Sequence, residues 1–258
     1  MKMRLLGAAI LLIVLVPLLI LGGIYFDIGV AIIVALSFRE LISLFKKKNK
    51  LPIVIEICAY ISVIVVTLSL DALLQAIALV IMILFIPLII FKKGEYNFTS
   101  ATSLLGIIVF LGVIYHGIIN VRMGGIEEIL YLLSITILTD TFAYVGGKIF
   151  GKTKLIERIS PNKTVEGSLI GLIIATTISS ILYIFFVNPG INIALIILIT
   201  FILSIIGQIG DLVFSAIKRE YEIKDYSNII PGHGGMLDRF DSIAFVTLLY
   251  IVIKLLFL

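Results

Sequence analysis

The sequence predicts an all-α, polytopic integral membrane bundle of about nine transmembrane helices, with its N-terminus in the cytoplasm. Of its 258 residues, 61% are hydrophobic and only 14% are charged. The mean hydropathy of +1.24 is far above that of soluble globular domains. Apolar runs of about 20 residues, long enough to cross a hydrocarbon core of about 30 Å, recur along the chain. The protein is therefore expected in the cell membrane, with the lipid bilayer as its solvent.

Nine apolar runs are expected to span the membrane. Those of the N-terminal half are Leu5–Phe26, Ile28–Phe45, Ile53–Leu70, Leu73–Phe91 and Ala101–Asn120. Those of the C-terminal half are Ile126–Gly146, Ser168–Val187, Ile191–Phe214 and Ile243–Phe257. The first is long and ends in no clear small-residue cleavage motif, which favours a span over a signal peptide. The second carries Arg39 and Glu40 near its end, and the last is short.

The basic residues indicate the orientation. Short basic loops stay on the cytoplasmic side of a membrane. If the N-terminus is cytoplasmic, 17 of the 20 Lys and Arg residues fall on that side, so the count supports this orientation. An odd number of spans then leaves the C-terminus outside. The net charge of +4 follows from this topology and from attraction to anionic lipid. No nucleic-acid partner is expected.

The two halves of the chain differ in character, although one membrane domain, residues 1–258, is the simplest interpretation. Residues 1–125 have short loops and few polar groups within their spans, as expected of scaffold helices. Residues 126–258 place Asp140, Gln208 and Asp211 inside spans, and two long cytoplasmic loops, 147–167 and 215–242, follow. Because intramembrane carboxylates are costly, this half is expected to be catalytic.

The second loop begins with a stripe of polar side chains. Asp211, Ser215 and Lys218 have i, i+4, i+7 spacing, which places them on one face of a helix, with Arg219 beside them. A carboxylate and two cations on one stripe are suited to holding a metal and phosphates. Asp211, Lys218 and Arg219 are therefore candidate catalytic residues.

The same loop continues with the turn Pro231–Gly235, which contains His233, Gly234 and Gly235. Its glycines let backbone N–H groups approach an oxyanion closely. A histidine between glycines is as easily a turn residue as a proton-transfer group. The turn predicts a phosphate contact.

Two more carboxylates follow the turn. Asp238 and Asp241 are three residues apart, so both lie on one helix face, with Arg239 between them. Together with Asp211 they supply the hard oxygen ligands that Mg²⁺ prefers while it also keeps waters and nucleotide phosphates. We expect Asp211, Asp238 and Asp241 to form a Mg²⁺ site, so Asp238 and Asp241 are candidate catalytic residues as well.

The first loop supplies a second phosphate-binding segment. Ser160 followed by Pro161 predicts a helix start, which would direct free N–H groups and Lys163 toward an anion. Gly167 and Gly171, four residues apart, indicate close helix packing. Upstream, Asp140, Tyr144 and Gly147 form a stripe facing the bundle. Both loops are cytoplasmic and are expected to meet over one site.

The second loop resembles the signature of the phosphatidate cytidylyltransferases, also called CDP-diglyceride synthetases. The matching residues are Ser215, Lys218, Arg219, Lys224, Asp225, Ser227, Pro231, His233, Gly234, Gly235, Asp238, Arg239 and Asp241. The segments DTFAYVGGKIFGKTKL and ISPNKTVEG resemble a second region of that family. Together the matches cover the C-terminal half, whereas the N-terminal half matches only as a hydrophobic bundle of suitable size.

The resemblance implies that CTP and phosphatidate react, with Mg²⁺, to give CDP-diacylglycerol and pyrophosphate. It implies metal binding by Asp211 and Asp238, supported by Asp241, and phosphate binding by Lys218 and Arg219. The remaining expected substrate contacts are Ser215, Lys163, Asn162, Ser160, Lys148, Tyr144, Lys224, His233, Gly234, Gly235 and Arg239. The active site would face the cytoplasm.

Other functions stay open from the sequence. A polyprenol kinase or a cytidylyltransferase for ether-linked archaeal lipids would use the same nucleotide. An ion-coupled transporter would use Asp140 and Asp211 as a proton relay. Against the transporter stand the missing internal repeat and the absence of helix-breaking residues in the middle of Ile191–Phe214. A homodimer is an assembly that the sequence leaves open.

Overall fold

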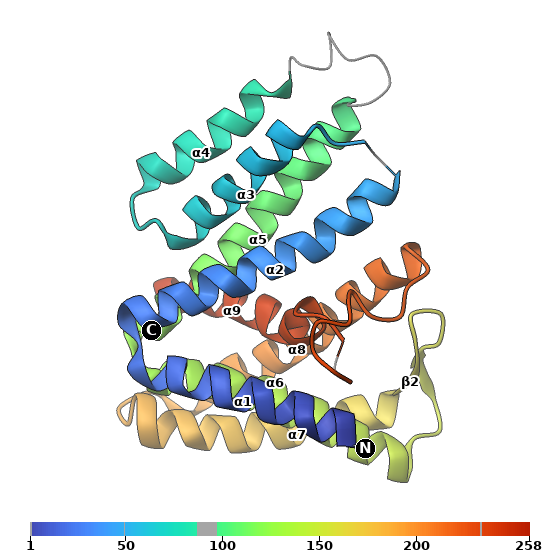
Figure 1. Ribbon diagram of the computed structural model, residues 1–258. Helices are drawn as coiled ribbons and strands as arrows, with labels where there is room; N and C mark the ends of the chain where they lie inside the picture. Colours follow the sequence, from blue (N-terminus) through green and yellow to red (C-terminus); the bar gives the residue numbers. More distant parts are fainter. Residues whose placement is uncertain (1, 49, 87–96, 233) are drawn as a thin grey trace. The chain divides into compact units, whose positions relative to one another are not determined.

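The computed structural model describes residues 2–48, 50–86, 97–232 and 234–258 (Figure 1). These residues form a helical protein with one small hairpin. The helices are α1 (Lys2–Leu21), α2 (Gly23–Lys48), α3 (Ile53–Leu68), α4 (Ala72–Leu84), α5 (Phe98–Gly124), α6 (Ile126–Phe150), α7 (Val165–Leu182), α8 (Ile193–Glu220) and α9 (Leu237–Phe257). The hairpin consists of β1 (Lys154–Ile156) and β2 (Ser160–Thr164), and a π-helical turn, η2 (Tyr183–Val187), extends α7.

The described helices make this a multi-pass helical membrane protein. Six are long and apolar enough to cross a bilayer: α2, α5, α6, α7 with η2, α8 and α9. Shorter apolar helices cover Leu11–Leu21, Ile53–Leu68 and Ala72–Leu84. Each of the nine expected spans lies mainly in a different described helix, although the end of the first lies in α2 and the end of the fourth lies outside the described residues. Nine crossings and a cytoplasmic N-terminus stay predictions.

The boundary between the first two spans differs from the expected one. The sequence placed Phe26 at the end of the first span, whereas the structure ends α1 at Leu21 and places Phe26 in α2. Gly22 and Gly23 have φ of +63° and +51°, the left-handed region that glycine enters at little cost. This glycine pair, rather than a charged residue, separates the helices.

The predicted helix start at Ser160 and Pro161 is wrong. These residues lie in β2, where Ile156 pairs with Ser160 and Lys154 with Thr164. A residue before proline favours extended backbone, and proline, which lacks an N–H, is tolerated at the edge of a sheet. Helix α7 begins at Val165 because the Thr164 hydroxyl accepts a hydrogen bond from the Gly167 N–H at 3.2 Å.

The second loop is shorter than the expected range 215–242. Helix α8 continues to Glu220 and therefore includes Ser215, and α9 begins at Leu237, which places Asp238 and Asp241 on it. The connecting segment is 221–236. The i, i+3 relation of Asp238 and Asp241 on one helix is confirmed.

The chain divides into two compact units. One comprises Met1–Asn120 with Asp225–Leu237, and the other comprises Val121–Lys224 with Asp238–Leu258. In the first, α2 packs on α3 and α3 on α4 (Figure 1). This division falls close to the expected one at residue 125, apart from the segment 225–237. A single membrane domain stays a prediction.

In the second unit, α6 and α7 pack together unusually closely. A Cβ at Gly167 would lie 2.8 Å from the Gly147 Cα, and one at Gly171 would lie 2.9 Å from the Ala143 backbone N. Only glycine allows the two backbones to approach so far. The predicted role of Gly167 and Gly171 in close packing is confirmed. The contact brings the ends of both helices, and the hairpin between them, to one place.

Candidate active site

The hairpin of the second unit is anchored at its base. Glu166, in the first turn of α7, accepts hydrogen bonds from the Lys152 N–H at 3.0 Å and the Thr153 N–H at 3.2 Å. The Val165 N–H donates to the Thr153 carbonyl at 3.0 Å. These bonds join the two ends of the hairpin to each other at the start of α7, and they fix the position of β2 relative to α7.

A second contact ties the hairpin to α8. The Arg219 Nε donates to the Ile159 carbonyl at 3.2 Å, and its Nη1 donates to the Ile223 carbonyl at 3.0 Å. Arg219 therefore holds the hairpin turn against the end of α8. This contact gives Arg219 a structural role that the sequence did not suggest, and its role in phosphate binding stays a prediction.

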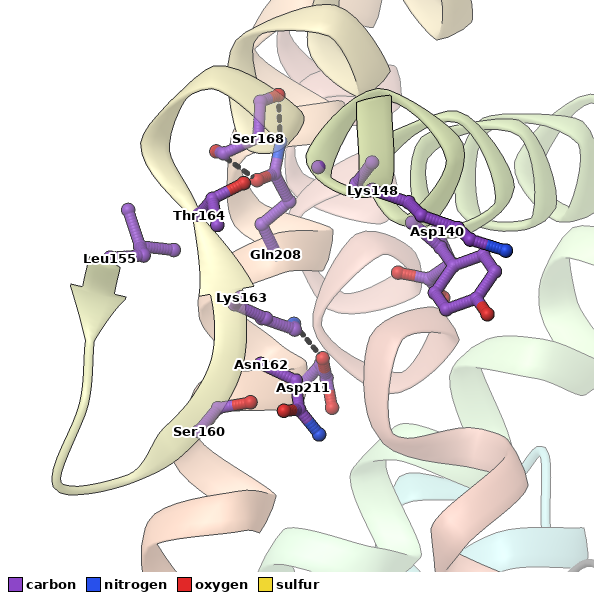
Figure 2. Close-up of a pocket in the computed structure, with 13 residues that line it drawn as sticks. Asp140, Lys148, Leu155, Ser160, Asn162, Lys163, Thr164, Ser168, Gln208 and Asp211 are labelled. Carbon is purple, nitrogen blue, oxygen red and sulfur yellow. Dashed lines mark hydrogen bonds and ion pairs between the residues drawn. The ribbon is translucent and has the colours of Figure 1, made fainter. Parts of the chain in front are cut away.

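The hairpin, α6, α7 and α8 enclose a cavity of about 490 Å³ (Figure 2). Its lining residues are Asp140, Ala143, Tyr144, Gly147, Lys148, Leu155, Ser160, Asn162, Lys163, Thr164, Ser168, Gln208 and Asp211. The sequence-predicted stripe of α6 and the predicted contacts of β2 thus line one cavity. Its volume lies within the range of pockets that bind small-molecule ligands.

An ion pair crosses this cavity between the hairpin and α8. The Lys163 Nζ donates to the Asp211 Oδ2, as Figure 2 shows. Burial lowers the pKa of the Lys163 ammonium below its usual range, whereas the carboxylates of Asp140 and Asp241 act in the opposite direction. This ion pair joins the first loop to α8, and the Arg219 contact with Ile159 brings residues of the two expected loops together; a common substrate site over both loops stays a prediction.

A second ion pair lies at the start of α9. The Lys218 Nζ donates to the Asp238 Oδ1 at 2.7 Å, and the two side chains are 10% and 2% exposed. Asp241 interacts electrostatically with Lys218 and with Lys163. Its Oδ1 accepts a hydrogen bond from the Ser242 N–H at 2.8 Å. The second loop therefore contributes to the same charged cluster as the first.

Asp140, on α6, completes this charged cluster. It interacts electrostatically with Lys163, Asp241 and Arg239, and the Ser242 hydroxyl donates to its Oδ2 at 3.4 Å. The cluster's anions are Asp140, Asp211, Asp238 and Asp241, and its cations are Lys163, Lys218 and Arg239. With four carboxylates and three cations, its formal charge is −1.

The carboxylates of Asp211 and Asp238 are of the chemical type that binds Mg²⁺. Among the residues that the structure describes, no three His, Cys, Asp or Glu side chains form a metal-binding group. Mg²⁺ usually takes only one or two protein carboxylates, however, and completes its shell with waters and nucleotide phosphates. Asp211 and Asp238 each offer such a carboxylate, now hydrogen-bonded to a lysine. The donor set is thus suitable for Mg²⁺.

Several predicted substrate contacts are not brought to the cavity wall. Ser215 lies half-buried on α8, while Lys224 and Arg239 are exposed. Gly234 and Gly235 belong to the first unit, and His233 lies outside the described residues. Binding of substrate by these residues stays a prediction.

One feature of the cavity wall and one feature of the first unit were missed from the sequence. The Ser168 hydroxyl donates to the Gln208 Oε1, and the Gln208 Nε2 donates to the Ser168 carbonyl at 3.4 Å, so the pair joins α7 to α8 at the cavity wall (Figure 2). Gln208 was visible as a polar residue inside a span. Glu40, in the first unit, accepts hydrogen bonds from the segment before α9. Its only sequence signal was a carboxylate near the end of an apolar run.

The fold and the site define a polytopic membrane protein whose polar residues gather at the ends of its C-terminal helices. The chain matches the model of the cytidylyltransferase family over residues 2–257 and belongs to that family. It is 37% identical to a phosphatidate cytidylyltransferase of Staphylococcus haemolyticus (strain JCSC1435) over 252 residues, covering 95% of this chain and 96% of the relative. It is 36% identical, with the same coverage, to a phosphatidate cytidylyltransferase of Staphylococcus aureus (strain COL).

Proposed function

We propose that this chain transfers the cytidylyl group of CTP to phosphatidate, giving CDP-diacylglycerol and pyrophosphate. The observation that carries the proposal is the pairing of Lys163 with Asp211 in one cavity, whose lining also includes Asp140, Lys148 and Asn162. It joins two motif-bearing segments that are 48 residues apart. The names of the relatives supply the nucleotide class and the lipid acceptor. The enzyme is a nucleotidyltransferase of phospholipid biosynthesis.

The main obstacle to this reaction is electrostatic, because the donor and the acceptor are both anions. An oxygen of the lipid phosphate attacks the α-phosphorus of CTP and forms a new P–O bond. The bond from the α-phosphorus to the oxygen bridging to the β-phosphorus breaks, and pyrophosphate leaves with that oxygen. The nucleophile is already charged and needs little help from a general base. Positioning and charge stabilisation therefore dominate the catalysis.

The chain's own cations meet this requirement. Lys163 and Lys218 are held at the cluster by carboxylates, so their ammonium groups are in place before phosphates arrive. Binding of the triphosphate lets each lysine direct hydrogen bonds to phosphate oxygens. Lys148 and Tyr144 from α6, with Ser160 and Asn162 from β2, supply further donors around the nucleotide.

Asp211 and Asp238, with Asp241 in support, would hold Mg²⁺. When bound, the ion neutralises charge on the triphosphate and on the departing pyrophosphate. Asp211 lies on the cavity wall, and Asp238 belongs to the charged cluster that includes Lys163. The placement of the basic residues supports a site that faces the cytoplasm.

The proposal is tested with the purified chain in detergent, supplied with Mg²⁺, a defined phosphatidate and each of the four ribonucleoside triphosphates in turn. We expect CDP-diacylglycerol by mass spectrometry, formed fastest with CTP, and one pyrophosphate per lipid product. An ether-linked acceptor in a parallel reaction shows whether the acyl ester matters. Formation of a lipid product without a cytidine, or of none, contradicts the proposal.

A further inference from the structure

Glu40 is a buried carboxylate in a helix that can cross a bilayer. It lies on α2 within the candidate span Gly23–Lys47, and it is 2% exposed. A carboxylate removed from water costs several kcal/mol unless hydrogen bonds or charges compensate for the lost hydration. The hydrogen bonds that Glu40 accepts therefore indicate its role.

Glu40 receives three hydrogen bonds from one segment. The Ser227 hydroxyl and the Met236 N–H donate to its Oε1 at 2.6 and 2.8 Å, and the Leu237 N–H donates to its Oε2 at 2.9 Å. The Ser227 Oγ also accepts a hydrogen bond from the Ile229 N–H at 3.3 Å. One carboxylate thus binds both ends of the segment 227–237. All of these residues belong to the same compact unit.

The backbone of the segment is shaped for this contact. The Ile230 N–H donates to the Gly234 carbonyl at 2.9 Å, which closes the turn. Gly232 and Gly234 have φ of +73° and +82°, where other residues are strained. A Cβ at Gly235 would lie 2.7 Å from the Glu40 Cδ. The glycines therefore allow the backbone to close around an anion, and that anion is a side chain of the protein.

We propose that Glu40 is a positioning residue that fixes the start of α9 and, through it, Asp238. The inference rests on the proposed function, in which Asp238 is a metal ligand. The Leu237 N–H is bound to Glu40, and Asp238 is the next residue in the chain. The first N–H groups of a helix lack partners within the helix, and a carboxylate there satisfies them and complements the helix dipole. Glu40 thereby limits the backbone positions open to Asp238.

This role requires a carboxylate. Met236 and Leu237 donate to different oxygens, so two acceptor atoms are needed at the same time. In Glu40→Gln one of those oxygens becomes an NH₂ group, which places a donor against a backbone donor. Glu40→Asp keeps both acceptors but draws them back by one methylene, and is expected to retain part of the function.

The experiment compares Glu40→Gln with Ser37→Ala, a matched control on the same helix. Ser37 is fully buried and its hydroxyl lies 2.6 Å from the Tyr115 hydroxyl, so the control removes a buried hydrogen bond without touching the segment 227–237. Amide hydrogen exchange is measured on metal-free protein in detergent. Glu40→Gln should speed exchange at Met236 and Leu237 by about 10-fold or more, while Ser37→Ala leaves it unchanged.

The second readout is the Mg²⁺ concentration that gives half-maximal turnover. Displacing a group that orients a metal ligand typically weakens metal binding by about 10-fold or more, so Glu40→Gln should raise this concentration accordingly. A purely structural defect lowers the amount of active protein and leaves the concentration at its wild-type value. Glu40→Asp should fall between the wild type and Glu40→Gln.

Unchanged exchange in Glu40→Gln, or lower turnover with unchanged Mg²⁺ dependence, overturns the proposal. If Glu40→Gln does not insert into the membrane, Ser227→Ala replaces it. That variant removes one of the three donors and should shift both readouts in the same direction by a smaller factor, and no shift overturns the proposal. Failure of the wild type to make CDP-diacylglycerol would count against the proposed function alone, because the exchange experiment does not depend on turnover.

Discussion

Truncation of Asp238 to alanine should destabilise the protein strongly. Its side chain is 2% exposed and accepts a hydrogen bond from Lys218 at 2.7 Å, and the lysine side chain is 10% exposed. The alanine variant removes the carboxylate to which the buried Lys218 ammonium is hydrogen-bonded, and the loss of one member of a buried ion pair costs about 3–5 kcal/mol. For a chain of this size, that loss lowers the unfolding midpoint by about 6–20 °C.

The double variant Lys218→Met, Asp238→Leu separates stability from catalysis. It removes both charges of the pair, and replacing a buried ion pair with apolar residues is often neutral or stabilising. Part of the lost stability should therefore return, although Asp241 loses its interaction with Lys218. Turnover should stay below about 1% of the wild-type rate in both variants, because a metal ligand is missing in each. Stability is followed as the heat-induced loss of monodisperse protein on size-exclusion chromatography in detergent.

Two outcomes would refute this reasoning. An alanine variant that unfolds within about 2 °C of the wild type would mean that the pair is not desolvated as the structure has it. A double variant that is as unstable as the alanine variant would mean that Asp238 stabilises α9 by contacts other than its charge. Wild-type turnover in the double variant would remove both residues from the site.

Four further predictions follow from the same structure. Asp211→Asn should lower turnover by about 100-fold or more while the protein still inserts, and near-normal activity of membrane-inserted protein at any Mg²⁺ concentration would exclude Asp211 as a ligand. Arg219→Gln should impair nucleotide use and, because the Arg219 Nε donates a hydrogen bond to the Ile159 carbonyl, should speed protease cleavage in the hairpin. The membrane orientation of the loop should stay unchanged. Cysteine labelling that reveals an inverted loop would instead mean that Arg219 determines the topology. Gly167→Ala should destabilise the protein by about 1–3 kcal/mol, since its Cβ would meet the Gly147 backbone. Gly106→Ala, whose Cβ would meet no atom within 4 Å, should be close to neutral. Equal effects of the two variants in a thermal unfolding assay would contradict the close α6–α7 contact. Removal of divalent cations with EDTA should abolish CDP-diacylglycerol formation and added Mg²⁺ should restore it, and turnover that persists in EDTA would exclude a metal.

The sequence was sufficient for the helical membrane architecture, because an apolar run long enough to cross a bilayer has few alternatives to a helix. Its errors fell where the residue pattern alone is compatible with two backbone conformations. At Ser160 and Pro161, the same residue pair that can begin a helix lies in a strand, since strand pairing with β1 is a tertiary contact. At Gly22 and Gly23, two positive φ angles divide what reads as one continuous apolar run.

Much of the candidate site was also predictable. Helical spacing placed Asp211 and Lys218 on one face of α8, and the paired carboxylates of α9 were visible as a pattern of two charges three residues apart. The role of Glu40 could not be predicted, because its partners are 187 to 197 residues away and two of them are backbone N–H groups. Such groups occur at every residue except proline, and they leave no pattern in the sequence.

The most direct test of the proposed reaction is to find which phosphorus of CTP reaches the lipid. Purified protein is incubated with phosphatidate and Mg²⁺ in two parallel reactions, one with CTP labelled at the α-phosphorus and one with CTP labelled at the γ-phosphorus. Cytidylyl transfer predicts label in the lipid extract from the α-labelled nucleotide only, and label in pyrophosphate from the γ-labelled one. Lipid labelled only from γ-labelled CTP would contradict cytidylyl transfer and identify a kinase.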